Sequence, residues 1–452
     1  MDRLTLDPDN PIVALATPWG TSAISVIRAS GHGSIEKTAQ IFSSPSRLLN
    51  APGGTIMHGT LVAFDTGGAV DDVIIAVYRS PKSYTGQDSV EVFAHGSLPG
   101  IQRILMLFKS VGFRDAAPGE FTLRAFLNKK MDLTRAEAVR EIVAAKTEQA
   151  HSLALHRLNG AVEARIRENK QKLLQIMAEL EIQLDYPEDE VDYPVTRPPL
   201  ESIDGVIKDI KALLETYRLG RIYQEGIRVA LAGRTNAGKS SIFNIFLRED
   251  RSIVSEVHGT TRDYIESWIS IEGVPVSLYD TAGLRKSDNP VEREGVRRAE
   301  RVIENAHIIL YVVDSVIGIL KEDEEFFADR DCLKLWNKID ISRNPPPEGF
   351  IPLSALTGEG FLSLEKEILQ IATSGRSILT GEVVIDSDRQ RDLLKRGVDA
   401  LENVKQAMGE CLPLDVISLD LKDALDALGE LTGEITTADI LNEIFSRFCV
   451  GK

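Results

Sequence analysis

The string "RVALAGRTNAGKSS" at residues 228–241 constrains the fold of this chain more than any other. An apolar run with strand-forming residues ends at Gly233, and Gly238, Lys239 and Ser240 complete the pattern GxxxxGKS before the helix-forming run "SIFNIFL". Glycines let backbone N–H groups turn toward an anion, the helix N-terminus adds a positive dipole, and the lysine reaches terminal phosphates. The serine hydroxyl can hold Mg²⁺. The string therefore predicts a strand, a phosphate-binding loop and a helix.

Two further strings supply groups that act beside such phosphates. "DTAG" at residues 280–283 ends the strand "VPVSLYD", which we expect to pair as a hairpin with "YIESWISI". Asp280 can act on Mg²⁺ through a water molecule, and Gly283 can contact the γ-phosphate. "GTTRD" at residues 259–263 offers a threonine that can bind Mg²⁺ from a loop.

Two further strings predict which nucleotide base the protein recognises. "NKID" at residues 337–340 follows the apolar strand "CLKLW", and the carboxylate of Asp340 can accept two hydrogen bonds from the guanine edge. Adenine has neither donor, so it would leave that carboxylate unpaired at a cost of roughly 1–3 kcal/mol. "SAL" at residues 354–356 can place a backbone N–H on the guanine oxygen. The five strings, in this order, predict GTP binding.

The predicted GTP-binding residues come from all five strings and from the segment before "GTTRD". They are Asn236, Ala237, Gly238, Lys239, Ser240, Ser241, Ser255, Glu256, Val257, His258, Gly259, Thr260, Thr261, Asp280, Thr281, Ala282, Gly283, Asn337, Lys338, Asp340, Ser354, Ala355 and Leu356.

Catalysis of hydrolysis needs a group that the motifs do not supply. Many small GTPases place a glutamine after the DTAG string to orient water, but Leu284 stands here and has no polar atom. Glu292, expected in the first turn of a helix that Pro290 opens, is a candidate; the alternative is that it only compensates the helix dipole. The side-chain oxygen of Asn236 could hold a monovalent cation against the phosphates, or Asn236 could simply tolerate the turn.

Length and composition limit the number of domains, the kinds of partner and the compartment that this chain can have. A length of 452 residues suggests about three domains, and the net charge of −16 argues against a surface built mainly to coat nucleic acid, although it leaves room for a local basic patch. Three widely spaced cysteines without a CxxC pair fit a reducing cytoplasm rather than a zinc site or disulfides. The acidic start predicts no signal peptide, and the lack of a long apolar run predicts no membrane association.

Periodicity divides the chain into four stretches. Residues 1–117 mix helices with strands, which are predicted at residues 23–30, 55–64, 71–79 and 89–97. Residues 118–217 are helical, 218–375 alternate strands with helices, and 376–452 are helical again. "LTRAEAV" predicts a capping box in which Thr134 caps a helix and Glu137 reaches back. These stretches predict one helical domain, split in sequence by an inserted α/β unit.

The chain resembles the tRNA-modification GTPase family MnmE, also called TrmE, over essentially its full length. The resemblance is carried by "SYTGQDSVEVFAHG", "PGEFTLRAFLNKKMDLTRAEAV", "AGRTNAGKSS", "GTTRD", "DTAGLR" and the terminal "FCVGK". It implies a multidomain α/β and α+β protein: an N-terminal α+β folate-binding domain that dimerises, a discontinuous helical domain, and an inserted Ras-like P-loop GTPase domain. Thr235 departs from the family pattern, which has proline there.

The resemblance also implies site residues. Glu292 falls on the family's catalytic glutamate. Mg²⁺ is assigned to Ser240 and Thr261, and K⁺, which drives dimerisation of the GTPase domains, to Asn236, Ser255, Val257 and Thr260. 5-Formyltetrahydrofolate is assigned to Arg28, Glu91, Lys130 and Lys452.

The C-terminal "FCVGK" is expected to fold back to the folate pocket rather than fray. Cys449 either lines that pocket with a chemical role or is a small buried hydrophobe. The implied function is GTP hydrolysis coupled to modification of carbon 5 of the tRNA wobble uridine, with the FAD-dependent partner MnmG in a heterotetramer; FAD belongs to that partner. A ribosome-assembly GTPase and a stalk-type regulatory GTPase are the alternatives, but no basic RNA-binding domain or membrane-binding tip is visible in the sequence.

Overall fold

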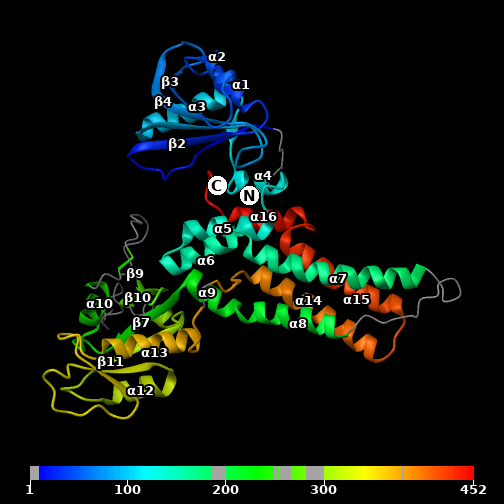
Figure 1. Ribbon diagram of the computed structural model, residues 1–452. Helices are drawn as coiled ribbons and strands as arrows, with labels where there is room; N and C mark the ends of the chain where they lie inside the picture. The colour runs from blue at the N-terminus through cyan, green and yellow to red at the C-terminus, as the bar shows by residue number, and fades with distance from the viewer. Residues whose placement is uncertain (1–9, 186–199, 249–251, 254–265, 281–299, 379–380) are drawn as a thin grey trace. The chain divides into compact units, whose positions relative to one another are not determined.

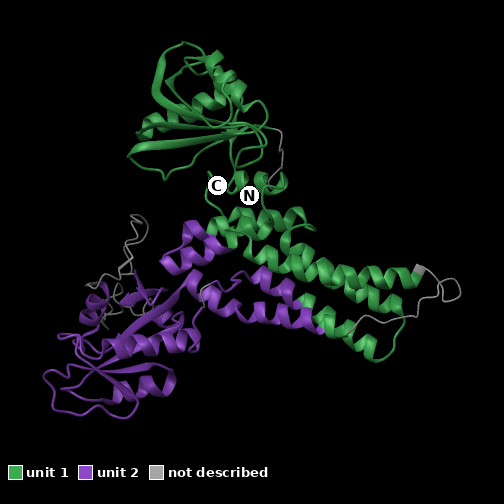
Figure 2. Cartoon of the chain, viewed as in Figure 1, with its two compact units in different colours: residues 1–140, 157–203, 396–452 green, residues 141–156, 204–395 purple. Residues whose placement is uncertain are grey.

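The computed structural model describes residues 10–185, 200–248, 252–253, 266–280, 300–378 and 381–452 (Figure 1). The chain forms two compact units, each assembled from segments that are far apart in the sequence (Figure 2). The first unit contains residues 1–140, 157–203 and 396–452, and the second contains residues 141–156 and 204–395. Within the described residues, no helix is both long enough and apolar enough to span a bilayer.

The N-terminal part of the first unit is a six-stranded sheet. The four strands predicted between residues 23 and 97 are all present, and antiparallel pairing of β2 with β5 places Arg28 directly opposite Glu91. The strands, in hydrogen-bonded order, are β3 (Thr55–Val62), β4 (Ala69–Tyr78), β5 (Ser89–Gly96), β2 (Ser22–Ser30), β1 (Ile12–Leu15) and β6 (Arg114–Asp115).

Three helices, α1 (Ser34–Ala39), α2 (Pro45–Leu49) and α3 (Leu98–Ser110), bury their apolar residues against this sheet. Ser97 caps α3 by accepting a hydrogen bond from the Gly100 N–H at 3.2 Å. The buried stripe of α3, with Ile101, Ile104 and Phe108, follows the helical period and fixes which face of the helix meets the sheet. The α+β character predicted for this region is confirmed.

The helical part of the first unit is built from helices of an early and a late part of the sequence. Helix α7 packs against α15, although more than 200 residues separate them in sequence, so the helical domain is discontinuous as predicted (Figure 1). The helices of the helical stretches, including those that continue into the second unit, are α4 (Glu120–Leu127), α5 (Leu133–Ala144), α6 (Glu148–Leu158), α7 (Ala161–Asp185), α8 (Leu200–Glu215), α14 (Asp388–Gly409), α15 (Leu414–Thr432) and α16 (Ala438–Ser446).

The capping box predicted at Thr134 and Glu137 is wrong. Helix α5 already begins at Leu133, and the carboxylate of Asp132 accepts the Arg135 N–H at 2.8 Å. The hydroxyl of Thr134 donates to the same carboxylate at 2.9 Å. Asp132, two residues before Thr134, therefore caps α5 instead, since aspartate and threonine both suit the N-cap position.

The second unit contains a seven-stranded, mainly parallel sheet. The predicted hairpin is formed by β9 and β10, and β7 lies between β10 and β11. In hydrogen-bonded order the strands are β13 (Phe350–Leu353), β12 (Leu333–Asn337), β11 (Ile308–Asp314), β7 (Ile227–Gly233), β10 (Val274–Asp280), β9 (Glu266–Ile271) and β8 (Ser252–Ile253). Further helices of this unit include α9 (Tyr217–Glu225), α10 (Lys239–Arg248), α12 (Lys321–Asp329) and α13 (Phe361–Thr373).

Candidate functional site

The predicted phosphate-binding loop joins the end of β7 to the start of α10. Gly233 has φ +126°, and a Cβ there would lie 2.3 Å from the Val312 carbonyl oxygen. Gly238 has φ +103°, and a Cβ there would lie 2.1 Å from Nδ2 of Asn337. Asn236, at φ +63°, adopts the left-handed conformation that asparagine tolerates better than most residues. The glycine spacing is therefore required both by backbone conformation and by close packing.

Lys239 is buried at the centre of this loop. Its ammonium donates to the carbonyl oxygens of Gly233 at 2.6 Å and Arg234 at 2.7 Å. Burial lowers the pKa of Lys239, and the negative charge of Asp280 opposes that shift. The Lys239 ammonium and the positive end of the α10 dipole therefore attract an anionic ligand to the same place.

Two oxygen-bearing side chains that could hold magnesium lie together beside the loop. The hydroxyl of Ser240 donates to the Asp280 carboxylate at 3.0 Å, because parallel pairing brings the ends of β7 and β10 side by side. Hydroxyl and carboxylate oxygens suit Mg²⁺, which is usually bound through one or two protein groups together with substrate phosphates. Nowhere in the described part of the chain do three or more His, Cys, Asp or Glu side chains gather into a metal site. The residues present therefore fit magnesium that arrives with a nucleotide.

The loops predicted to recognise the base meet at the ends of β12 and β13. The amide of buried Asn337 donates to the Ala237 carbonyl at 2.7 Å and accepts the Ala355 N–H at 3.0 Å. The hydroxyl of Ser354 donates to the Asp340 carboxylate at 2.5 Å. Asp340 is otherwise exposed, so it can meet a base, while Asn337 ties the phosphate loop to the base loop.

Two groups that position these loops were missed from the sequence. Asp314, at the end of β11, pairs with the Lys338 ammonium at 2.6 Å. Asp323, on α12, pairs with Arg234 at 3.1 Å and accepts the Tyr311 hydroxyl at 2.8 Å. An acid at the carboxyl end of a strand next to β7 was a usable signal for Asp314, because ligands bind at that edge of parallel sheets. The partner of Arg234, 89 residues away, had no such signal.

Part of the predicted site lies outside the described residues. This applies to Ser255, Glu256, Val257, His258, Gly259, Thr260, Thr261, Thr281, Ala282, Gly283, Leu284 and Glu292. Of the predicted K⁺ ligands, the structure describes Asn236. Of the two predicted Mg²⁺ ligands, it describes Ser240.

A second cluster forms in the first unit around Arg28 and Glu91. The two side chains form an ion pair at 2.8 Å, with both partly buried, and the Tyr78 hydroxyl donates to the same carboxylate at 3.4 Å. The Arg28 guanidinium lies 5.5 Å from the ring centre of Tyr84 and 5.7 Å from that of Phe121. The cross-strand register of β2 and β5 places this charged pair between aromatic rings.

The C-terminal tail is docked on this cluster. The Arg28 guanidinium donates to the Gly451 carbonyl at 3.1 Å, and the Phe121 N–H donates to the Lys452 carbonyl at 3.2 Å. Gly451 has φ +94°, and a Cβ there would lie 2.5 Å from the Leu15 carbonyl oxygen. Burial, followed by the charge of Arg28, lowers the pKa of the Lys452 ammonium. The tail therefore meets Arg28 and the first strand through specific contacts.

The remaining predicted folate-site residues differ in their surroundings. Phe448 is buried, but the Cys449 thiol is exposed. The alternative in which Cys449 is a small buried hydrophobe is therefore wrong. Lys130 donates to the Pro81 carbonyl at 2.9 Å, on the loop that also carries Tyr84.

The parallel sheet, the phosphate loop and the Asn337 and Asp340 loop together define a P-loop GTPase. Comparison with known families then narrows this class. The profile of the GTP-binding protein TrmE N-terminus matches residues 11–130, and that of the MnmE helical domain matches residues 133–449. The chain belongs to the MnmE family of GTPases.

Full-length relatives agree with this assignment. The tRNA modification GTPase MnmE of Borreliella burgdorferi strain ZS7 is 39% identical over 460 residues, which cover 98% of each chain. The protein of the same name from Borrelia recurrentis is 40% identical over 100% of each chain, and that from Treponema denticola is 40% identical over 98% of each. The crystal structure of Aquifex aeolicus Era Y63A bound to GDP.AlF4- is 24% identical and covers 38% of this chain and 66% of its own, with a TM-score of 0.28, too low for a comparison of the folds.

The first prediction concerns the choice of base. Asp340→Asn should weaken GTP binding by roughly 1–3 kcal/mol, because the amide N–H would face the guanine donors. Xanthine nucleotides, whose 2-oxo group can accept from that amide, should gain affinity. Competition of GTP, XTP and ATP for a fluorescent nucleotide measures the shift; Asp331→Asn, an exposed aspartate before the same strand, is the control. Equal affinity of the parent for ATP and GTP would contradict the assignment.

Proposed function

We propose that this protein acts as a homodimer with the FAD-dependent partner MnmG to install an aminomethyl-type group on carbon 5 of the wobble uridine, U34, of certain tRNAs. The one-carbon unit comes from a bound folate, and GTP hydrolysis drives the cycle in the cytoplasm. Family membership supports the reaction class, and relatives of full length carry the name tRNA modification GTPase. The observation that carries the proposal is the docked tail, which joins the helical domain to the Arg28 and Glu91 cluster.

The chemistry of this cluster suits 5-formyltetrahydrofolate. A carboxylate such as Glu91 can accept the adjacent N–H groups of a pterin, and cations from the set Arg28, Lys130 and Lys452 suit the carboxylates of the folate glutamate. The bound folate supplies the one-carbon unit, while these residues orient it. The Arg28 guanidinium between Tyr84 and Phe121 keeps the Glu91 side chain fixed.

A reconstituted reaction tests this proposal. Protein, partner, unmodified tRNA transcript, GTP and a reduced folate are combined, and the nucleosides are analysed by mass spectrometry. We expect the aminomethyl-type uridine only with the complete mixture. GTP hydrolysis without any modified uridine, under conditions where the partner is loaded with FAD, would overturn the proposal.

We also propose that K⁺ takes the place of an arginine finger and draws two GTPase domains together. Asn236 supports this because its left-handed backbone sets an exposed side chain inside the phosphate loop. The remaining proposed K⁺ ligands are Ser255, Val257 and Thr260, and the catalytic carboxylate is Glu292. The division of the chain at residues 117/118, 217/218 and 375/376 into folate, helical, GTPase and helical parts belongs to the same proposal.

The second prediction tests the cation. GTP hydrolysis by the parent should be slow in NaCl and faster in KCl at equal ionic strength. Asn236→Ala should remove this difference while GTP affinity stays nearly unchanged, since the backbone N–H groups and Lys239 still hold the phosphates. Phosphate release and nucleotide binding, measured in both salts, separate the two effects. A parent rate indifferent to potassium would contradict the role of Asn236.

A further inference from the structure

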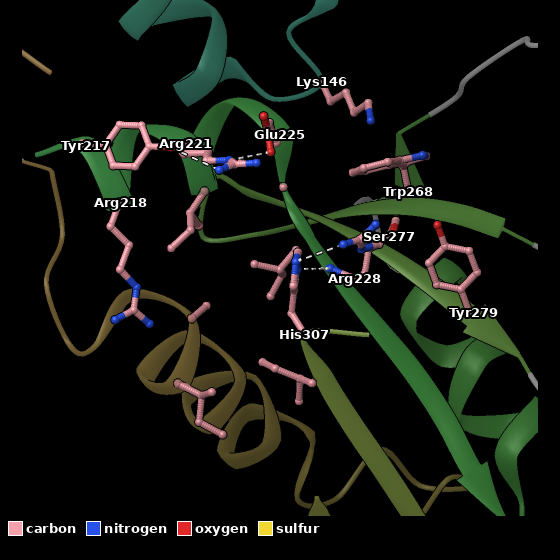
Figure 3. A pocket seen from close by; sticks show the side chains of 16 residues that line it. Lys146, Tyr217, Arg218, Arg221, Glu225, Arg228, Trp268, Ser277, Tyr279 and His307 are labelled. Atoms are coloured by element: carbon pink, nitrogen blue, oxygen red, sulfur yellow. Dashed lines mark hydrogen bonds and ion pairs between the residues drawn. The ribbon is translucent and has the colours of Figure 1, made fainter. Parts of the chain in front are cut away.

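The second unit contains a cavity of about 860 Å³ that lies apart from the phosphate loop and from the loop of Asn337 and Asp340 (Figure 3). It lies where β7 and β11 begin, at the opposite end of these strands from Gly233 and Asp314 of the nucleotide site. Helix α9 and the segment before α6 contribute Arg218 and Lys146 to its wall. Its volume lies in the range of sites for ligands of nucleotide size.

The strand register builds the floor of this cavity. Arg228 of β7 pairs with Ser277 of β10, and Ser277 pairs with Trp268 of β9. His307, which precedes β11, donates its N–H to the Arg228 carbonyl at 2.8 Å. Residues in register across neighbouring strands point to the same face. Four side chains distant in sequence are thus aligned in one row, and all four line the cavity.

Ser277 is the first member of this row that indicates a ligand. Its side chain is fully buried, and its hydroxyl oxygen has no hydrogen-bond partner within the described residues. A buried hydroxyl left unpaired costs about 1–3 kcal/mol. A ligand oxygen reaching the cavity floor would remove that cost.

Arg228 and His307 give a second indication. The Arg228 N–H donates to Nδ1 of His307 at 3.0 Å, so a neutral imidazole carries its proton on Nε2. That Nε2 lies 3.3 Å from Nη2 of Arg228, so two N–H donors face each other (Figure 3). Burial, and then the charges of Arg228 and Arg221, lower the pKa of His307 and so keep it neutral. An anionic oxygen could accept from both donors at once.

Positive side chains outnumber negative ones around the cavity. Arg221 is paired with Glu225, but Arg218 and Arg228 form no ion pair with any carboxylate that the structure describes. The Lys146 ammonium lies 2.9 Å from the ring centre of Trp268. In a chain of net charge −16, this concentration of cations beside aromatic and apolar wall residues is a local exception.

We propose that this cavity binds one nucleotide unit of an RNA strand. Its phosphate accepts hydrogen bonds from Arg228, His307 and Ser277, and its base lies against the apolar wall near Tyr279. Arginines and aromatic side chains around a phosphate are the usual means of holding single-stranded RNA. The choice of RNA over a free nucleotide rests on the proposed tRNA substrate.

Binding of a labelled, unmodified tRNA transcript to the full-length protein tests this site. Fluorescence anisotropy gives the affinity over a range of KCl concentrations. Replacing Arg218 and Arg228 together by glutamine should reduce the slope of log K against log salt by about 0.7–0.9 for each phosphate that the protein no longer neutralises. Lys366→Gln, which removes an exposed cation from α13 of the same unit, should leave the slope unchanged.

Ser277→Ala separates a ligand role from a structural one. If the hydroxyl serves a ligand, this variant should unfold at the same or a higher temperature, because an unpaired buried hydroxyl is removed. It should nevertheless bind the tRNA more weakly than the parent. Unchanged tRNA binding by both Ser277→Ala and the double arginine variant would overturn the proposal.

Uridine 5′-monophosphate distinguishes the source of the ligand. If it binds the parent, fails to bind the cavity variants, and those variants keep the parent's affinity for tRNA, the cavity is a site for free nucleotides and the RNA assignment is wrong. A parent that binds no tRNA also overturns it. The mass-spectrometric assay of U34 decides the proposed function independently, because modification can proceed without the cavity.

Discussion

Deleting residues 449–452 is expected to abolish modification of the wobble uridine. The deletion removes the Gly451 carbonyl that Arg28 contacts and the Lys452 carbonyl that the Phe121 N–H contacts, together with the Lys452 ammonium. Binding of 5-formyltetrahydrofolate, measured by calorimetry, should weaken. GTP hydrolysis should continue, because Lys239 and Asp280 lie in the other unit. Nucleoside mass spectrometry and phosphate release report the two activities separately.

Single substitutions show which feature of the tail is needed for modification of the uridine. Gly451→Ala should resemble the deletion, since its Cβ would lie 2.5 Å from the Leu15 carbonyl oxygen and φ is +94°. Val450→Ala is the matched control, because Val450 is 52% exposed. Cys449→Ser keeps the volume of this exposed residue, so a loss of modification with an intact fold would assign the thiol a chemical role. Full modification by the deletion variant would show that the tail is dispensable.

Replacing Glu292 by alanine is expected to lower GTP hydrolysis by about 10²–10⁴-fold, the usual contribution of a positioned proton-transfer group. Leu284 cannot orient water, so the carboxylate is expected to act as general base or through a second water. Nucleotide affinity should not change, because the contacts proposed for Lys239, Asn337 and Asp340 with the nucleotide do not involve Glu292. Single-turnover hydrolysis and nucleotide titration measure the two quantities.

Glu300→Ala is the control for this prediction. Glu300 is an exposed carboxylate eight residues further along the chain, and its removal changes the net charge equally. Normal hydrolysis by the Glu292 variant would instead assign that residue to compensation of the helix dipole, which contributes only about 0.3–1 kcal/mol to helix stability.

Local chemistry explains what could be predicted from the sequence. The phosphate loop follows from glycines at positions of positive φ, which other residues rarely adopt. The predicted role of Asp340 follows from a carboxylate that guanine satisfies and adenine does not. Strands β2 to β5 of the N-terminal sheet and the hairpin of β9 and β10 follow from β-branched residues and the turn residues that bound them. The error at Thr134 has the same origin: Asp132 is an equally good cap, and sequence alone does not rank the two.

Contacts between distant segments could not be predicted in this way. The positioning roles of Asp314 and Asp323, toward Lys338 and Arg234, depend on which strands and helices become neighbours. The exposure of Cys449 depends on how Phe448 packs, not on the residue type. Each of these follows from long-range packing, which has no local signal in the chain.

The sequence by itself determined the class of this protein, because a GTPase site is built from short strings whose chemistry is set by neighbouring residues. The tertiary structure alone decided where Arg28 meets Glu91 and the tail, and where Arg228 meets Ser277, Trp268 and His307. The physical reason is register: a shift of one residue between two strands turns every side chain to the other face. Which residues then share a site is fixed by the packing of the whole sheet.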